Sequence, residues 1–165
     1  MSPVYIGDYL SSINYVPSSC IKIENFFYTF DAPANDYAIA NKTNTGKVRR
    51  FNLIENIEDI DWCKEIKTAH ANSAAYNKAN AKIYIVPIWD YETTSDRVNA
   101  KFLYEYSLDF SSYKKINIPS VAMGVSYDSK KNKLYYYDYD HKIYLYENNE
   151  FIFYTEIDFT NIQEN

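Results

Sequence analysis

The side chains best suited to ligand binding lie in one aromatic and acidic segment, residues 89–98. It contains Trp89, Asp90, Tyr91 and Arg97. An aromatic ring offers an apolar face to a sugar or a protein partner, and the carboxylate and guanidinium beside it supply directional hydrogen bonds. Because loops on a rigid scaffold often carry binding residues, these four residues are predicted to bind a ligand. The alternative is that Trp89 covers an edge of the core and the loop is solvated.

A second candidate site is the tyrosine-rich run at residues 135–141. Its predicted binding residues are Tyr137, Asp138, Asp140 and His141. Strand alternation places its odd-numbered tyrosines on one face and Tyr136, Asp138 and Asp140 on the other, so that one face packs and the other meets water. Two carboxylates fall short of the about 6–8 oxygen ligands that calcium takes, and the calcium-loop pattern is absent. The aspartates are therefore interpreted as turn residues, and no metal is expected.

The sequence carries no signature of an enzyme. No serine stands in a G-x-S-x-G elbow, and Cys63, beside Trp62 in a predicted strand, is expected to be a buried and inert thiol. Asp90 with Glu92 or Asp96 leaves glycoside hydrolysis as a weaker alternative, since the separation of two carboxylates does not follow from sequence. A non-enzymatic protein without a cofactor is therefore expected.

Composition excludes several classes of protein. The chain has 165 residues, a formal net charge of −5, two cysteines and two histidines, which fits one globular domain without a disulfide framework or a structural zinc site. No Lys/Arg cluster extends beyond Lys47, Arg49 and Arg50, so nucleic acid is not an expected partner. Neither a Sec signal nor a membrane span is recognised. A soluble protein is expected.

An all-β fold is predicted from the 19 Tyr and 9 Phe, set against only 3 Gly, and from an internal repeat. Residues 73–84 recur as residues 124–135, with a polar turn between two β-rich runs in each copy. Two further strands follow each copy, at 101–106 and 113–118 and at 142–146 and 153–158. The residues that match between the copies are Tyr76 with Tyr127, Asn77 with Asp128, Lys82 with Lys133, and Tyr84 with Tyr135.

A fainter third copy precedes these two. Its strands are predicted at residues 21–30, 36–41, 46–53 and 59–66. Gly46 is expected to supply the positive φ that a tight hairpin turn requires. Residues 54–65 show a loose helical spacing, but the repeat favours a strand there.

Four strands repeated every 40 to 55 residues are typical of β-propeller blades. A single domain over residues 1–165 is predicted, with blades at 20–66, 70–118 and 121–159. Residues 1–19 form a partial blade or a closing strand, and a β-sandwich is the alternative fold. Three blades leave two sheet faces uncovered. The chain is therefore expected to pair with a second copy in a pseudo-six-bladed ring, to gain a fourth blade from residues 1–19, or to join a larger assembly.

The repeat resembles the propeller repeats of tail and receptor-binding proteins from phages of Gram-positive bacteria, and is similar to the repeat of helveticin-type bacteriocins. The resemblance lies in residues 70–77 with 82–86, and in residues 124–128 with 134–135 and 142–144. It implies a binding or scaffold module whose ligand is a cell-wall glycopolymer such as teichoic acid. It also implies a virion or extracellular location, with the cytoplasm as the alternative. The competing function is a small accessory or inhibitor protein that binds another protein.

Overall fold

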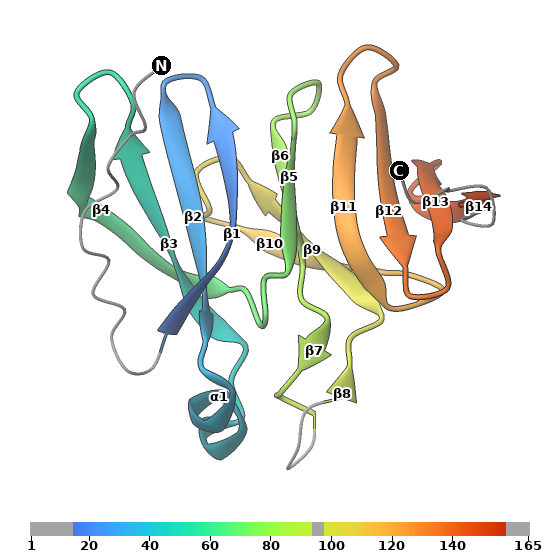
Figure 1. The fold of residues 1–165 in the computed structure, drawn as a ribbon, viewed down its shortest axis with the longest axis horizontal. Coiled ribbons are helices and arrows are strands. Elements are labelled where there is room, and N and C mark those ends of the chain that lie inside the picture. Colours follow the sequence, from blue (N-terminus) through green and yellow to red (C-terminus); the bar gives the residue numbers. More distant parts are fainter. Residues whose placement is uncertain (1–14, 94–97, 158–165) are drawn as a thin grey trace, which may run out of the picture.

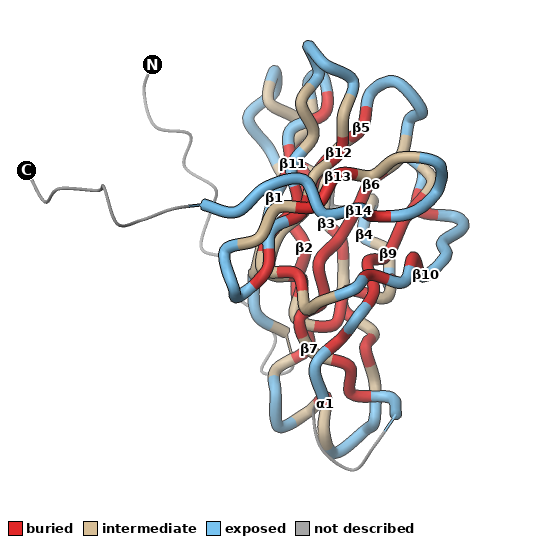
Figure 2. The backbone as a smooth tube through the Cα atoms, turned by 90° about the vertical axis from the view of Figure 1, so that its right-hand side faces the viewer, coloured by how far each residue is buried: buried red, intermediate tan, exposed pale blue. Residues whose placement is uncertain are grey.

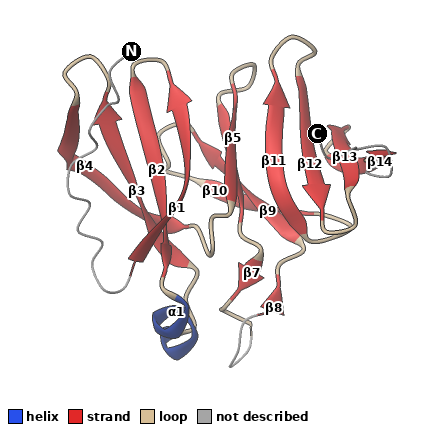
Figure 3. Ribbon diagram, in the orientation of Figure 1, coloured by secondary structure: helices blue, strands red, loops and turns tan. Residues whose placement is uncertain are grey.

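The computed structural model describes residues 15–93 and 98–157. It is an all-β fold of three four-stranded antiparallel sheets with one short helix, which confirms the predicted fold class (Figures 1 and 3). Sheet 1 consists of β1 (Tyr15–Ile23), β2 (Phe26–Pro33), β3 (Thr45–Asn52) and β4 (Ile57–Lys67). Sheet 2 consists of β5 (Ser73–Asn77), β6 (Lys82–Val86), β9 (Phe102–Ser107) and β10 (Tyr113–Asn117). Sheet 3 consists of β11 (Ala122–Asp128), β12 (Lys133–Asp138), β13 (Lys142–Glu147) and β14 (Glu150–Glu156).

The sheets stand in a row like neighbouring blades of a propeller. Their first strands, β1, β5 and β11, lie side by side, and the remaining strands of each sheet extend away from them (Figure 1). The two repeat copies fold alike at their first turn. The Asn77 side-chain oxygen accepts a hydrogen bond from the Ala79 amide at 3.0 Å, and the Asp128 carboxylate accepts one from the Lys130 amide at 2.9 Å. The matched Asn and Asp are thus turn residues, as the repeat predicts.

Sheet 2 is buried on both faces. Ile83 and Ile85 of β6 belong to the apolar cluster between sheets 1 and 2, and Tyr84 and Val86 belong to the cluster between sheets 2 and 3. All four are 0% exposed, and the core appears as the central buried tract in Figure 2. Burial on both faces explains why β6 is apolar without the in–out alternation of a half-exposed strand.

Sheet 1 differs from its prediction in two places. Residues 36–41 are not a strand but lie within the helix α1 (Asn35–Asn41), which buries Ala38 and ends at Lys42 with a φ of 48°. The predicted strand 21–30 is a hairpin in which Glu24, with a φ of 53°, lies in the turn. Neither Gly nor Pro marks that turn, and Asn25 is its one typical turn residue, so the local signal is weak. Residues 15–19 belong to β1, and residues 1–14 lie outside the described part.

Gly46 has a different role from the one predicted. It lies inside β3, and its φ is not in the left-handed region. A Cβ atom at this position would overlap the backbone oxygen of Asp31 and the hydroxyl of Thr68. Glycine is therefore required because two neighbouring segments approach the backbone closely, and not because of a turn.

Candidate functional site

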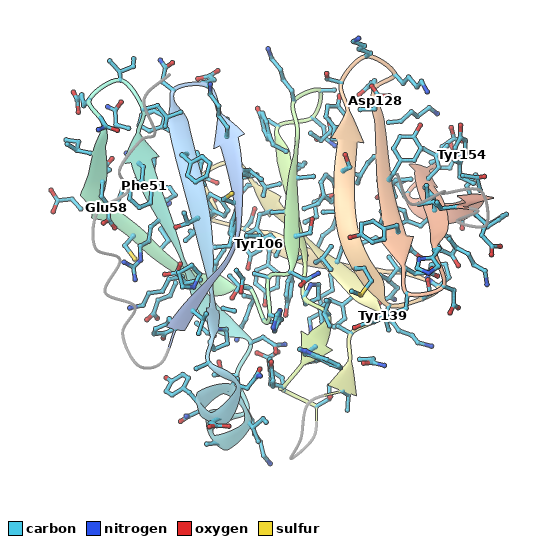
Figure 4. The ribbon with its side chains drawn as sticks, viewed as in Figure 1. Phe51, Glu58, Tyr106, Asp128, Tyr139 and Tyr154 are labelled. Atoms are coloured by element: carbon cyan, nitrogen blue, oxygen red, sulfur yellow. The ribbon has the colours of Figure 1, made fainter. Side chains whose placement is uncertain are left out.

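The connections between the second and third strands of the three sheets lie at one end of the molecule (Figure 1). In sheet 1 this connection is α1, and in sheet 2 it is the small hairpin of β7 (Trp89–Asp90) and β8 (Val98–Asn99). In sheet 3 it is the tight turn after β12, where Figure 4 labels Tyr139. The two predicted binding segments therefore lie at the same end of the molecule. Arg97 and Asp96 lie outside the described residues.

The segment from Trp89 to Tyr91 joins sheet 2 to sheet 1. Asp90 is 5% exposed, and its carboxylate accepts hydrogen bonds from the Asn44 side chain at 2.8 Å and from the Glu92 amide at 3.1 Å. The Tyr91 amide donates to the Asn44 side-chain oxygen at 2.9 Å. Tyr91 is 1% exposed, so its ring presents almost no face to solvent. Trp89 is half-buried against both apolar clusters, the position that the alternative interpretation gave it.

Asn44 is the centre of this buried network. It is 0% exposed, and its amide nitrogen also donates to the Tyr104 hydroxyl at 3.1 Å. Burial and then the charge of Glu92 raise the pKa of Tyr104, so that this hydroxyl keeps its proton at neutral pH. At the rim, the Lys67 ammonium donates to Glu92 at 2.6 Å. Asn44 was not among the predicted site residues, because an asparagine in a connecting segment gives no sign of partners 46 and 60 residues away.

The second candidate segment divides between the core and the surface. Asp138 is 3% exposed, and its carboxylate accepts hydrogen bonds from the amides of Asp140 at 2.9 Å and Lys142 at 2.9 Å. Its geometry is that of a turn residue, as interpreted from the sequence. His141 has a φ of 62° in the same turn. Asp140 is exposed, with its carboxylate 3.9 Å from the Lys142 ammonium. In the described part of the chain, no group of three or more His, Cys, Asp or Glu side chains is placed to hold a metal.

Tyr137 belongs to an aromatic surface that the sequence analysis did not recognise. It is 47% exposed, and a Cβ atom on Gly124 of the neighbouring strand would overlap its ring. The Tyr135 and Tyr154 rings meet on the same face, with their centroids 5.5 Å apart. We call this surface the outer face of sheet 3, because it points away from the cluster shared with sheet 2. It consists of Tyr135, Tyr137, Ile143, Ile152 and Tyr154, together with Leu145, which is itself buried.

The internal repeat shows that the outer face of sheet 3 corresponds to a buried face of sheet 2. Tyr135 and Tyr137 occupy the positions that Tyr84 and Val86 hold in sheet 2, 51 residues earlier. In sheet 2 both of these positions are 0% exposed, because sheet 3 covers them. In sheet 3 the matching positions are half-buried and 47% exposed. The face thus has the residues of a contact between sheets but, among the described elements, no sheet that covers it.

The opposite end of the row, the outer face of sheet 1, is more polar, although Phe27 and Phe51 lie on it beside Lys22 in the strand register. Lys22, Cys20 and Cys63 are exposed there, and the Arg49 guanidinium lies 3.0 Å from the Asp31 carboxylate. The prediction that Cys63 is buried is wrong, because alternation along β4 turns Trp62 toward the core and Cys63 outward. Glu58 and Tyr154 in Figure 4 mark the two ends of the row.

Comparison with known proteins finds the fold but no family. No family model and no curated protein matches the sequence. The allergen Mala s 1 of Malassezia sympodialis is similar in structure, with a TM-score of 0.59 and 10% identity over 84% of this chain and 47% of the other. A protein of unknown function from Bacteroides caccae is similar with a TM-score of 0.59 and 7% identity, over 93% of this chain and 50% of that one. Myxococcus xanthus glutaminyl cyclase is similar with a TM-score of 0.54 and 13% identity, over 88% of this chain and 52% of that one.

At these identities the similarity concerns the fold alone. The chain spans about half the length of the structures it matches. Among the described residues, no helix combines the length and the apolar character that crossing a membrane requires.

Proposed function

We propose that the chain is a non-enzymatic binding module that forms half of a ring and is completed by a second copy. The outer face of sheet 3 in each copy packs on the outer face of sheet 1 in the other, so that one two-fold axis closes both contacts. The observation that carries the proposal is that Tyr137 is exposed and Tyr135 only half-buried, at positions that the same repeat buries fully in sheet 2. An exposed aromatic face of this kind is typical of an interaction surface.

The length of the chain supports a second copy as the partner. Each of the three similar structures is about twice as long as the part that this chain covers. Two copies supply a comparable amount of the same architecture. In addition, both contacts between sheets within the chain join consecutive sheets through opposite faces. Packing of the outer face of sheet 3 on the outer face of the partner's sheet 1 would join two further sheets through opposite faces in the same way.

The chemistry of the two faces also fits. The outer face of sheet 1 carries the exposed Lys22, whose apolar stem and cationic end can lie over the tyrosine rings of sheet 3. Arg49 lies on the same face but is already paired with Asp31 and Glu58. The chain already uses this contact internally, since the Arg50 guanidinium lies 4.5 Å from the Phe26 ring centroid and 4.7 Å from that of Trp62. Arginine and tyrosine are also enriched at protein interfaces.

The ligand of the module is the second part of the proposal. A host-recognition role of the phage type, with a cell-wall glycopolymer as ligand, rests on the resemblance of the repeat alone. The alternative is an accessory factor that binds a different protein. The uncovered face of sheet 3 supports this alternative as well, because it suits any partner with an apolar surface.

Light scattering over a micromolar concentration range tests the ring. The chain of 19.4 kDa is expected to reach about twice that mass. Tyr137→Glu, which places a charge in the contact, is expected to yield a folded monomer with an unchanged circular dichroism spectrum. Tyr139→Glu is the matched control, because Tyr139 is 53% exposed but lies in the turn beyond β12, and this variant stays dimeric. A native chain that remains monomeric throughout the range would refute the proposal.

A further inference from the structure

A groove of about 470 Å³ separates sheet 1 from two turns of sheet 2. It lies on the inner side of sheet 1, away from the faces assigned to the ring contact, and away from the Trp89 segment. Its volume falls in the range of small-molecule sites, roughly 300–1,000 Å³. The residues that line it are Tyr28, Arg50, Trp62, Lys64, Lys82 and Asp109, together with small or polar turn residues.

Positive charge is concentrated in this groove although the whole chain carries a net charge of −5. Arg50, Lys64 and Lys82 line it, and Asp109 is the one acidic residue among the lining residues. Asp59 lies beside the groove, where its carboxylate accepts a hydrogen bond from Arg50 Nε at 3.0 Å. The site thus has three cations and two nearby carboxylates, of which Asp59 pairs with Arg50 from beside the groove, so that a net positive charge remains.

Arg50 and Lys64 are held in place before any ligand arrives. The Arg50 guanidinium lies over both the Phe26 ring and the Trp62 ring and is oriented by Asp59. Lys64 Nζ lies 5.4 Å from the Trp62 ring centroid and donates to the backbone oxygen of Asp109 at 2.5 Å. Fixed cations lose less side-chain entropy when they bind an anion, and this favours affinity.

The one lining carboxylate is occupied within its own turn. Asp109 accepts hydrogen bonds from the Ser111 amide at 3.1 Å and from the Ser111 hydroxyl at 2.8 Å. Hydrogen bonds from Ser107 and Ser111 lower the pKa of Asp109 to about 2. Its charge is therefore constant at neutral pH and stabilises the turn that forms one wall of the groove.

We propose that this groove binds a phosphoryl group carried on a small organic body, with Arg50, Lys64 and Lys82 as its cationic ligands. A phosphoryl group offers several acceptor oxygens and up to two negative charges, which suits a groove whose cations outnumber the carboxylates of Asp109 and Asp59. The aromatic wall of Tyr28 and Trp62 packs against the organic part of the ligand. This inference deepens the proposed binding function, but the groove lies within one copy and does not depend on the ring.

Tryptophan fluorescence tests the site, because Trp62 lines the groove and Trp89 is the other tryptophan of the chain. In a Trp89→Phe background, titration with glycerol 3-phosphate is expected to give a saturable change, while glycerol gives none. Inorganic phosphate is expected to bind more weakly, since it lacks the organic body. Equal affinity for phosphate and glycerol 3-phosphate would overturn the organic part of the proposal. The absence of any saturable change would overturn the whole.

Two lysine variants separate a specific site from a general effect of charge. Lys82→Gln is expected to weaken binding of glycerol 3-phosphate about tenfold or more, because it removes a charge-assisted contact. Lys131→Gln, an exposed lysine in the turn between β11 and β12, is the matched control and is expected to bind as the parent does. Equal weakening by both variants would contradict the assignment. Binding by the Tyr137→Glu monomer is expected to be unchanged, so failure of the ring and failure of the groove give different results.

Discussion

Replacement of Asn44 by alanine tests the conclusion that the segment around Asp90 and Tyr91 is structural. The buried Asn44 side chain makes three hydrogen bonds, one of them to the Asp90 carboxylate. A hydrogen bond to a charged group contributes about 1.5–3 kcal/mol, and each neutral one contributes about 1 kcal/mol. Asn44→Ala is therefore expected to lower the free energy of unfolding by about 4 kcal/mol, a large part of the total for a small domain.

Equilibrium urea unfolding measures this loss, with an m-value equal to that of the parent indicating that the unfolded state is unaltered. Asn41→Ala is the matched control, because Asn41 is exposed and makes one hydrogen bond, to the Tyr37 backbone oxygen at 2.8 Å. This variant is expected to lose less than about 1 kcal/mol. If Asn44→Ala were as stable as Asn41→Ala, the buried network would not hold sheet 1 against sheet 2, and the reasoning would fail.

Two further predictions concern glycine and pH. Gly46→Ala forces a Cβ atom against the backbone of Asp31 and is expected to lower the free energy of unfolding in urea by about 2–3 kcal/mol. In Gly124→Ala the new Cβ atom meets the exposed Tyr137 ring, so the expected loss is less than about 1 kcal/mol, with a weaker dimer in light scattering. An equal loss of stability in both variants would contradict this account. Burial raises the pKa of Tyr84, Tyr104 and Tyr106 from 10.0, and that of Tyr136 from 10.0 to about 12. Because the unfolded chain releases these protons near pH 10 and the folded chain retains them, stability is insensitive to these groups below pH 10 and falls as the pH rises from 10 through about 12. A urea midpoint that stays constant over that interval would contradict the burial of these hydroxyls.

The features that sequence predicted well are local. Alternation along the strands and the turn chemistry of Asn77 and Asp128 depend on neighbouring residues, so the repeat predicted both the strands and the hairpin turns of sheets 2 and 3. The all-β class followed from the same local signals. The prediction of a strand at residues 36–41 was wrong because it relied on the alignment with the other two copies. The two alanines of this short segment favour a helix, and the segment lies in α1.

The features that could not be predicted from the sequence depend on contacts between residues far apart in the chain. Trp89, Asp90 and Tyr91 have the composition of a binding loop, and only the docking of this segment on Asn44 shows that Asp90 and Tyr91 are buried. Their ligand-binding role, like that of Tyr137 and His141, stays a prediction. The outer face of sheet 3 could have been predicted from the sequence, because the 51-residue repeat aligns Tyr135 with Tyr84, which is buried. The repeat does not predict which residues lie on the outer face of sheet 1, because the sequence of this third copy differs too much from the other two to be aligned with them residue by residue.

The reactivity of the two cysteines tests the ring most directly. Cys20 and Cys63 are both exposed on the outer face of sheet 1, which the partner's sheet 3 is proposed to cover. As the protein concentration rises and the measured mass doubles, the rate of reaction with a thiol reagent is expected to fall for both cysteines in the native chain and to stay high in the Tyr137→Glu monomer. A dimer whose cysteines react as fast as those of the monomer would contradict the ring and would indicate that two copies pair through their sheet 3 faces instead.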